Sequence, residues 1–151
     1  MERTGEPVVF RTELEVRSYE LDSFRHANHA VFLNYLEQAR FEALRAGGFS
    51  YSDIQTRGWG IHVVRMEIDY TAELKLGDAF MIETWIHAYR RTSMVLAQRI
   101  TRHRPGHPDT VASESRVTVV WIGENGRPMR VPAEARAALG EPSDGPSRPA
   151  P

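Results

Sequence analysis

The chain of 151 residues contains no cysteine. Without thiols it can form no disulfide, no thiolate metal site and no cysteine nucleophile, so its chemistry must come from other polar side chains. An excess of charge of either sign is also missing, because 19 basic residues face 20 acidic ones and the net charge is -1. No global field therefore favours nucleic acid or an anionic membrane as a partner.

Long apolar runs are absent as well. No stretch approaches the roughly 18 residues that a membrane helix needs, and the start MERTGEPVVF lacks the basic and apolar parts of a secretion signal. We therefore expect a cytoplasmic protein without membrane contact. A hydrophobic content of 41% supports one core in a chain of this length, and we predict a single domain over residues 1–140. The proline-rich composition of residues 141–151 predicts a disordered tail.

The sequence pattern does predict one long helix among several strands. His29 to Ala46 offers strong helix formers without Gly or Pro, and Gly47-Gly48 closes the segment. Alternation of apolar and polar residues predicts strands at 8–16, 61–71, 79–89, 94–102 and 110–122. We expect a polar connection at 50–58 and a short terminal helix at 132–139.

This order of elements predicts an α+β fold with an antiparallel sheet wrapped around one helix. Consecutive strands joined by short turns should be hairpin neighbours. We interpret the charged face of the sheet as solvated; it carries Glu67, Asp69, Glu83, Arg99, Glu114 and Arg116. Segments 80–82 and 117–121 are apolar on both faces, so a second copy is expected to cover the sheet in a homodimer or homotetramer.

The segment before the long helix carries the chemistry. Asp22, His26 and His29 lie at or near the predicted helix start, where unpaired backbone N–H groups can hold an oxyanion. A carboxylate there can attack a thioester carbonyl or activate water. The residue types alone leave another interpretation open, because polar residues at a helix entry also serve as caps.

Residues 16–40 fit the pattern V-R-x-x-(D/E)-x-D-x-x-(G)-H-x-N-(N/H)-x-x-(Y/F)-L-x-Y-x-E-x-A-R. This pattern resembles the signature of hotdog acyl-CoA thioesterases related to 4-hydroxybenzoyl-CoA thioesterase, and the likeness continues more loosely through 63–70, 76–78 and 91–93. The resemblance implies a hotdog fold, a five-stranded antiparallel sheet around one long central helix. It also implies hydrolysis of acyl-CoA without a cofactor. A thioesterase for acyl carrier protein and a non-catalytic acyl-CoA-binding protein remain alternatives.

The same resemblance assigns roles to four residues. Asp22 matches the catalytic aspartate, which acts as nucleophile or general base. His29 matches the position whose backbone N–H polarises the thioester carbonyl. His26 and Asn28 match the H-x-N pair that lines the same pocket.

Two positions depart from the family pattern. Arg25 stands where many relatives have glycine, so either the turn before the helix differs or the arginine contacts substrate. Ser18 stands where an aromatic residue is frequent, which implies a different shape on that side of the acyl pocket.

A basic link between the predicted third and fourth strands is the candidate CoA site. Arg90 and Arg91 stand beside Ser93, and guanidinium groups with a hydroxyl suit phosphate recognition. Relatives place CoA-phosphate contacts near this link, although an exposed hairpin would have the same composition. His103 and His107 have no partners at metal-ligand spacing, so we predict no metal.

Overall fold

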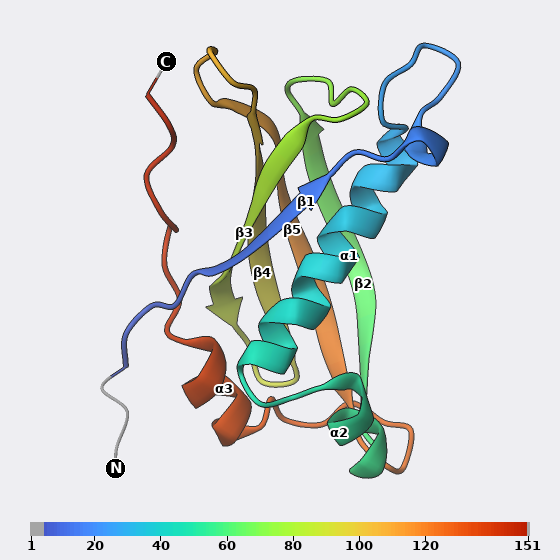
Figure 1. Cartoon of the computed structure of the whole chain (residues 1–151). Coiled ribbons are helices and arrows are strands. Elements are labelled where there is room, and N and C mark those ends of the chain that lie inside the picture. The colour runs from blue at the N-terminus through green and yellow to red at the C-terminus, as the bar shows by residue number, and fades with distance from the viewer. Residues whose placement is uncertain (1–4, 151) are drawn as a thin grey trace.

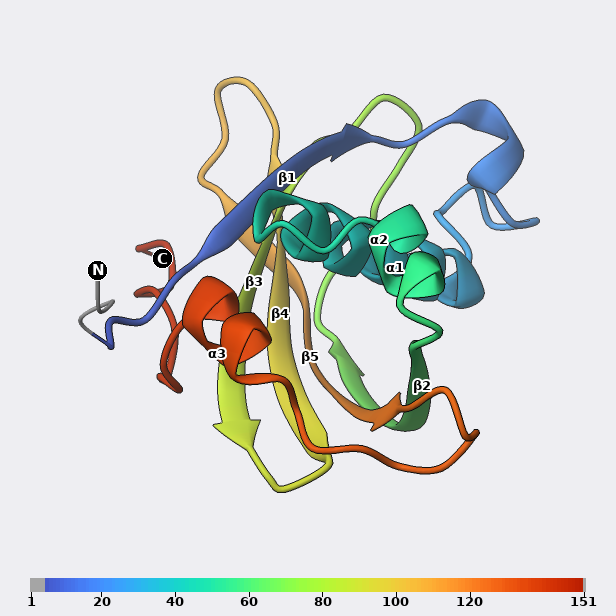
Figure 2. The same ribbon diagram turned by 90° about the horizontal axis from the view of Figure 1, so that it is seen from below.

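The computed structural model describes residues 5–150, so residues 1–4 and Pro151, which belong to the predicted domain and tail, lie outside the described part. A five-stranded antiparallel sheet curves around one long helix, as Figure 1 and Figure 2 show. This is the predicted α+β hotdog arrangement. The elements are β1 (Phe10–Glu15), a 3-10 turn (Ser18–Glu20), α1 (His29–Ala46), α2 (Tyr51–Thr56), β2 (Gly60–Tyr70), β3 (Ala79–Tyr89), β4 (Ser93–His103), β5 (Thr110–Ile122) and α3 (Ala133–Leu139).

The central helix α1 has the bounds that the sequence predicted. It begins after Asn28, whose side chain accepts a hydrogen bond from Ala30 N, and it ends at Gly47. Its buried face contacts the concave side of the sheet and consists of Phe32, Tyr35, Leu36, Ala39, Ala43 and Leu44. This packing fixes the first turn of α1 against the sheet, next to the loop that carries Asp22.

The strand order is β1-β3-β4-β5-β2. The hairpins β3–β4 and β4–β5 are neighbours as predicted, but the expectation that β2 and β3 pair was wrong, because β2 pairs with β5 at the opposite edge. The reason is that α1 and α2 carry the chain across the concave face to that edge. Residues 71–78 then return it over the end of the sheet, anchored where Thr71 N donates to Ala112 O.

Two shorter helices flank this core. The segment predicted as a polar connection contains α2, which begins with a capping box formed by Ser50 and Asp53. The predicted terminal helix is present as α3. Within residues 5–150, no helix is long and apolar enough to cross a membrane.

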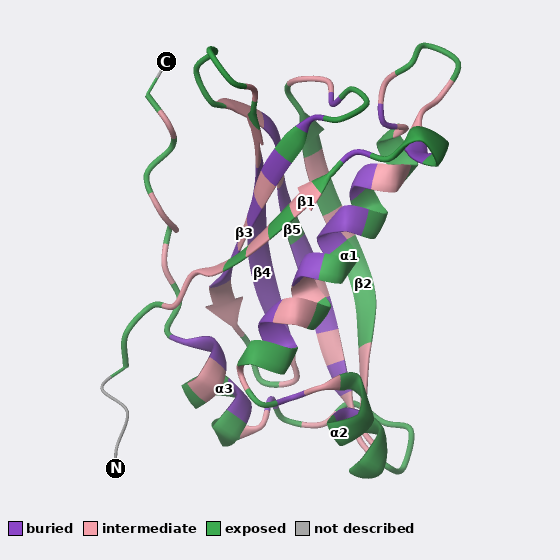
Figure 3. Cartoon of the chain, viewed as in Figure 1, coloured by how far each residue is buried: buried purple, intermediate pink, exposed green. Residues whose placement is uncertain are grey.

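The convex face of the sheet is not uniformly solvated. Seven consecutive residues of β4, from Met94 to Ile100, are buried, so both faces of this strand are covered (Figure 3). On the convex side Arg99 is only 4% exposed, so the predicted solvated face was wrong for this residue. Composition predicts disorder after Gly140, whereas residues 141–150 lie against the convex face and contact Arg99.

Candidate active site

The loop between the 3-10 turn and α1 folds around the carboxylate of Asp22. One oxygen, Oδ1, accepts hydrogen bonds from Phe24 N at 2.9 Å and from His26 N at 3.3 Å. The other oxygen, Oδ2, accepts no hydrogen bond from any residue in the range 5–150. Oδ1 therefore holds the turn together, as the capping interpretation requires, while Oδ2 has no hydrogen-bond partner among the described residues.

Arg25 occupies an unusual backbone conformation in this loop. Its φ is 65°, and in the described part of the chain it is the sole residue other than glycine with a positive φ. An L-residue pays about 1–2 kcal/mol for this left-handed conformation, which explains why glycine suits the family pattern here. The turn thus keeps the shape that glycine would favour although the residue is an arginine.

The first turn of α1 presents a free donor beside Asp22. Val31 N donates to Asn28 O and Ala30 N donates to the Asn28 side chain, but the N–H of His29 has no acceptor among residues 5–150. The positive end of the helix dipole adds to this donor. An oxygen that gains negative charge here would be stabilised.

A hollow of about 420 Å³ joins these groups. It is lined by Asp22, His26, Ala27, His29, Phe32 and residues 70–73. Three of the four predicted residues therefore meet at one place. The fourth, Asn28, precedes the lining residue His29 in the sequence but does not line the hollow itself. Its side chain caps α1 instead.

Tyr70 forms part of the wall of this hollow, a position that the sequence did not indicate. Its hydroxyl donates to His29 O at 2.8 Å, and its ring lies edge-on to His29 and to Phe32, with a centroid distance of 5.1 Å to Phe32. Burial raises the pKa of Tyr70, so the hydroxyl stays protonated as a donor at neutral pH. Sequence spacing gives no sign of this contact, because β2 lies far along the chain from His29.

A buried polar cluster holds the Asp22 loop on α1. The carboxylate of Glu20, 8% exposed, accepts hydrogen bonds from Tyr35 Oη and from Arg17 N, both at 2.8 Å. The backbone oxygen of Glu20 accepts from Asn28 N. Burial and the bond to Glu20 raise the pKa of Tyr35. The family pattern contains the arginine, the acidic residue and the tyrosine of this cluster, but their spacing along the chain did not indicate that the side chains meet.

The predicted CoA-binding residues lie at the other end of the sheet. β1 ends beside Ala79, close to the Asp22 loop, whereas Arg90 and Arg91 follow the far end of β3. Eleven strand residues separate the two ends, which corresponds to roughly 33 Å. Both arginines are exposed, and Ser93 begins β4 beside them. Within one chain the structure does not bring this group to Asp22.

A second hollow, of about 380 Å³, lies between α1, α2 and the beginning of β2. Its wall is mainly apolar and aromatic and includes Phe41, Leu44, Phe49, Ile54, Trp59, Ile61, Met94 and Leu96. Such a surface suits a hydrocarbon group.

His103 and Arg104, at the end of β4, both pair with acidic side chains. Arg104 makes two hydrogen bonds to the Asp78 carboxylate, at 2.8 and 2.7 Å, and His103 contacts Asp109. No group of three or more His, Asp or Glu side chains suited to a metal ion occurs among the described residues.

The chain is similar in sequence to proteins that are named as thioesterases. The sequence profile of the Thioesterase-like superfamily matches residues 16–139. The chain is 30% identical over 128 residues to the acyl-acyl carrier protein thioesterase ATL2 of Arabidopsis thaliana, covering 85% of this chain but only 66% of that protein. It is 30% identical over 112 residues to the long-chain acyl-CoA thioesterase FadM of Escherichia coli, covering 74% and 82% of the two chains.

A solved structure shares the fold. The crystal structure of a 4-hydroxybenzoyl CoA thioesterase complexed with 4-hydroxybenzoyl CoA superposes with a TM-score of 0.81 at 18% identity. The match covers 87% of this chain and 99% of that one. At this identity the likeness concerns the fold.

Proposed function

Because the chain belongs to the Thioesterase-like superfamily, we propose that it hydrolyses the thioester bond of an acyl-CoA to a free acid and CoA. One observation carries the proposal. Asp22, whose Oδ2 accepts no hydrogen bond from residues 5–150, and His29, whose N–H has no acceptor among them, line the same hollow, as a base or nucleophile and an oxyanion donor would.

The reaction divides between these two groups. The thioester carbonyl oxygen accepts a hydrogen bond from His29 N–H, which stabilises the negative charge that develops when the carbonyl carbon is attacked. Asp22 Oδ2 either attacks this carbon or takes a proton from a water that does. Collapse of the intermediate breaks the carbon–sulfur bond, and the CoA thiolate takes up a proton. If Asp22 attacks, the acyl group is left on Asp22 as a mixed anhydride, and water hydrolyses it to the free acid and the restored carboxylate. If Asp22 acts as the base, the water oxygen is already bonded to the acyl carbon, and Asp22 passes the proton it took to the thiolate.

The proposal includes self-association through the edge of the sheet. β2 is an edge strand, and Val63 and Val64 are 52% and 59% exposed on it. An unpaired edge is a template for another strand. Antiparallel pairing of two β2 strands would turn the Arg90 and Arg91 end of one chain toward the Asp22 end of the other. A homodimer, alone or within a homotetramer, would thus supply phosphate contacts that a single chain lacks.

The apolar hollow between α1, α2 and the beginning of β2 would accept an acyl group, which supports a thioester of a hydrophobic acid. FadM is named for long-chain acyl-CoA and ATL2 for acyl-acyl carrier protein, so a carrier-protein thioester is the second candidate substrate. The two substrates share the thioester and differ in the group to which the pantetheine arm is attached. A cytoplasmic location stays a prediction.

Thiol release tests the proposal directly. The purified protein is incubated with acyl-CoAs of different chain length and with the matching acyl carrier proteins, and a thiol reagent detects the product. The chain has no cysteine, so the reagent detects only released thiol. Faster turnover of acyl-CoA is the expected result. Binding of acyl-CoA without thiol release would instead indicate the non-catalytic alternative.

A further inference from the structure

A row of alternating charges crosses the convex face of the sheet. Arg11, Glu83, Arg99 and Glu114 are paired in this order on the adjacent strands β1, β3, β4 and β5. Arg99 lies 3.0 Å from Glu114 and 3.8 Å from Glu83, and Arg11 lies 3.3 Å from Glu83. The row carries charges of both signs on one surface. An interface between two identical faces requires such a surface, because each charge of one copy must meet an opposite charge of the other.

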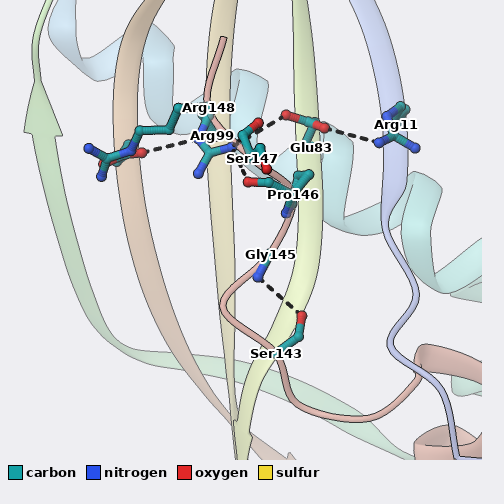
Figure 4. Close-up of polar contacts among 9 residues, drawn as sticks. Arg11, Glu83, Arg99, Ser143, Gly145, Pro146, Ser147 and Arg148 are labelled. Atoms are coloured by element: carbon teal, nitrogen blue, oxygen red, sulfur yellow. Dashed lines mark hydrogen bonds and ion pairs between the residues drawn. The ribbon is translucent and has the colours of Figure 1, made fainter. Parts of the chain in front are cut away.

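The C-terminal segment, residues 141–150, is fastened onto this face. Arg99 Nη1 donates to Pro146 O at 2.8 Å, as Figure 4 shows, and Arg148 pairs with Glu114. Farther along β3, Ser143 N donates to Ile86 O at 3.0 Å. These contacts involve the backbone of the segment as well as its side chains, so they fix its path.

Trp85 is buried beneath the same segment. It lies one row from Arg99 on the convex face, pairs with Ala97 and is 6% exposed. Gly145 passes so close over the indole that an added Cβ would overlap the ring atoms. Its φ is 83°, a conformation that favours glycine. The segment therefore covers an aromatic surface beside the charged row.

We propose that the C-terminal segment covers a self-association surface, and that it excludes a second copy of this chain from the convex face. Two sheets that pack face to face lie about 10 Å apart, and their side chains fill this space. A backbone segment fastened between them leaves no room for that approach. Without the segment, the indole of Trp85 and a self-complementary row of charges become accessible together, as in an interface with an aromatic centre.

This surface is separate from the β2 edge and from the Asp22 hollow. Its role is therefore independent of the proposed thioesterase activity. A chain that associates through β2 would double its mass once more when the segment is removed.

The test compares three variants with the full chain by sedimentation velocity at equal concentrations. One ends at Glu141. A second, Gly145→Ala, keeps the segment but places a Cβ against Trp85. The matched control is Gly106→Ala, because Gly106 has a similar φ of 78° and open space where the Cβ would lie. Hydrogen exchange at Ser143 N–H reports whether the segment is bound.

We expect the truncated chain and Gly145→Ala to have about twice the mass of the full chain, with Gly106→Ala unchanged. Exchange at Ser143 should be slow in the full chain and fast in Gly145→Ala. A peptide of residues 142–150 should return the truncated chain to the lower mass. Equal masses for the folded truncated and full chains would overturn the proposal, and so would rapid exchange at Ser143 in the full chain.

Discussion

Replacing Asp22 by asparagine separates the two roles of this carboxylate. The amide oxygen of asparagine can still accept from Phe24 N and His26 N, the two bonds that hold the loop. The second oxygen becomes an NH₂ group, which can neither attack a carbonyl nor accept a proton. Asp22→Asn should therefore preserve the turn and remove the chemistry.

The two effects differ in size. Loss of a general base lowers kcat about 10²–10⁴-fold, which corresponds to roughly 2.7–5.4 kcal/mol of transition-state stabilisation. Exchanging two charge-assisted hydrogen bonds for neutral ones costs about 1 kcal/mol at this half-exposed site, or a fall of roughly 2–4 °C in Tm. The affinity for a non-hydrolysable acyl-CoA analogue should change less than about tenfold, or 1.4 kcal/mol.

The assay measures thiol release, Tm and analogue binding on the same preparations. Asp22→Ala should lose as much activity but more stability, because both N–H groups lose their acceptor. The control is Asp53→Asn, since Asp53 holds the first turn of α2 through a similar cap far from the hollow. A folded Asp22→Asn protein with turnover within a few-fold of wild type would refute the role assigned to Oδ2.

Three further predictions concern single contacts. Changing Arg90 and Arg91 together to alanine should raise KM for acyl-CoA, with a smaller effect on acyl-pantetheine; an equal effect on both would argue against phosphate contact. Tyr35→Phe should lower the free energy of unfolding by about 1–3 kcal/mol, because a buried carboxylate loses a donor, and an unchanged Tm would contradict this. Burial acts to raise the pKa of Asp78, but the hydrogen bonds from Arg104 and from Lys75 N, together with the positive charges of Arg104 and Arg102, outweigh it and lower that pKa. The ionised Asp78 therefore stabilises the fold above its unfolded pKa of about 3.9, so the Tm difference between wild type and Asp78→Asn should be large at neutral pH and shrink as pH falls through the folded pKa; a difference independent of pH would contradict it.

Local patterns in the sequence determined the helices, the strands and the segment that holds the candidate active site. The bounds of α1 were predictable from helix formers framed by Asn28 and Gly47, because caps act on the backbone nearby. Alternation located all five strands to within about two residues. The turn around Asp22 and the free N–H of His29 also belong to one short stretch of sequence, and the family pattern pointed to it.

Contacts between distant segments were decided only by the tertiary structure. The sequence did not indicate that β2 pairs with β5, that Tyr70 forms a wall of the hollow, or that Arg90 lies at the opposite end of the sheet from Asp22. The path of residues 141–150 was likewise decided by contacts with distant segments. Their composition has too few apolar groups to predict order, yet Arg99 and Trp85 offer them donors and a flat surface that exist only after the sheet has formed. The spacing of residues along the chain determines the periodicity of helices and strands and the positions of their caps. Which distant surfaces meet depends instead on how the whole sheet closes around α1.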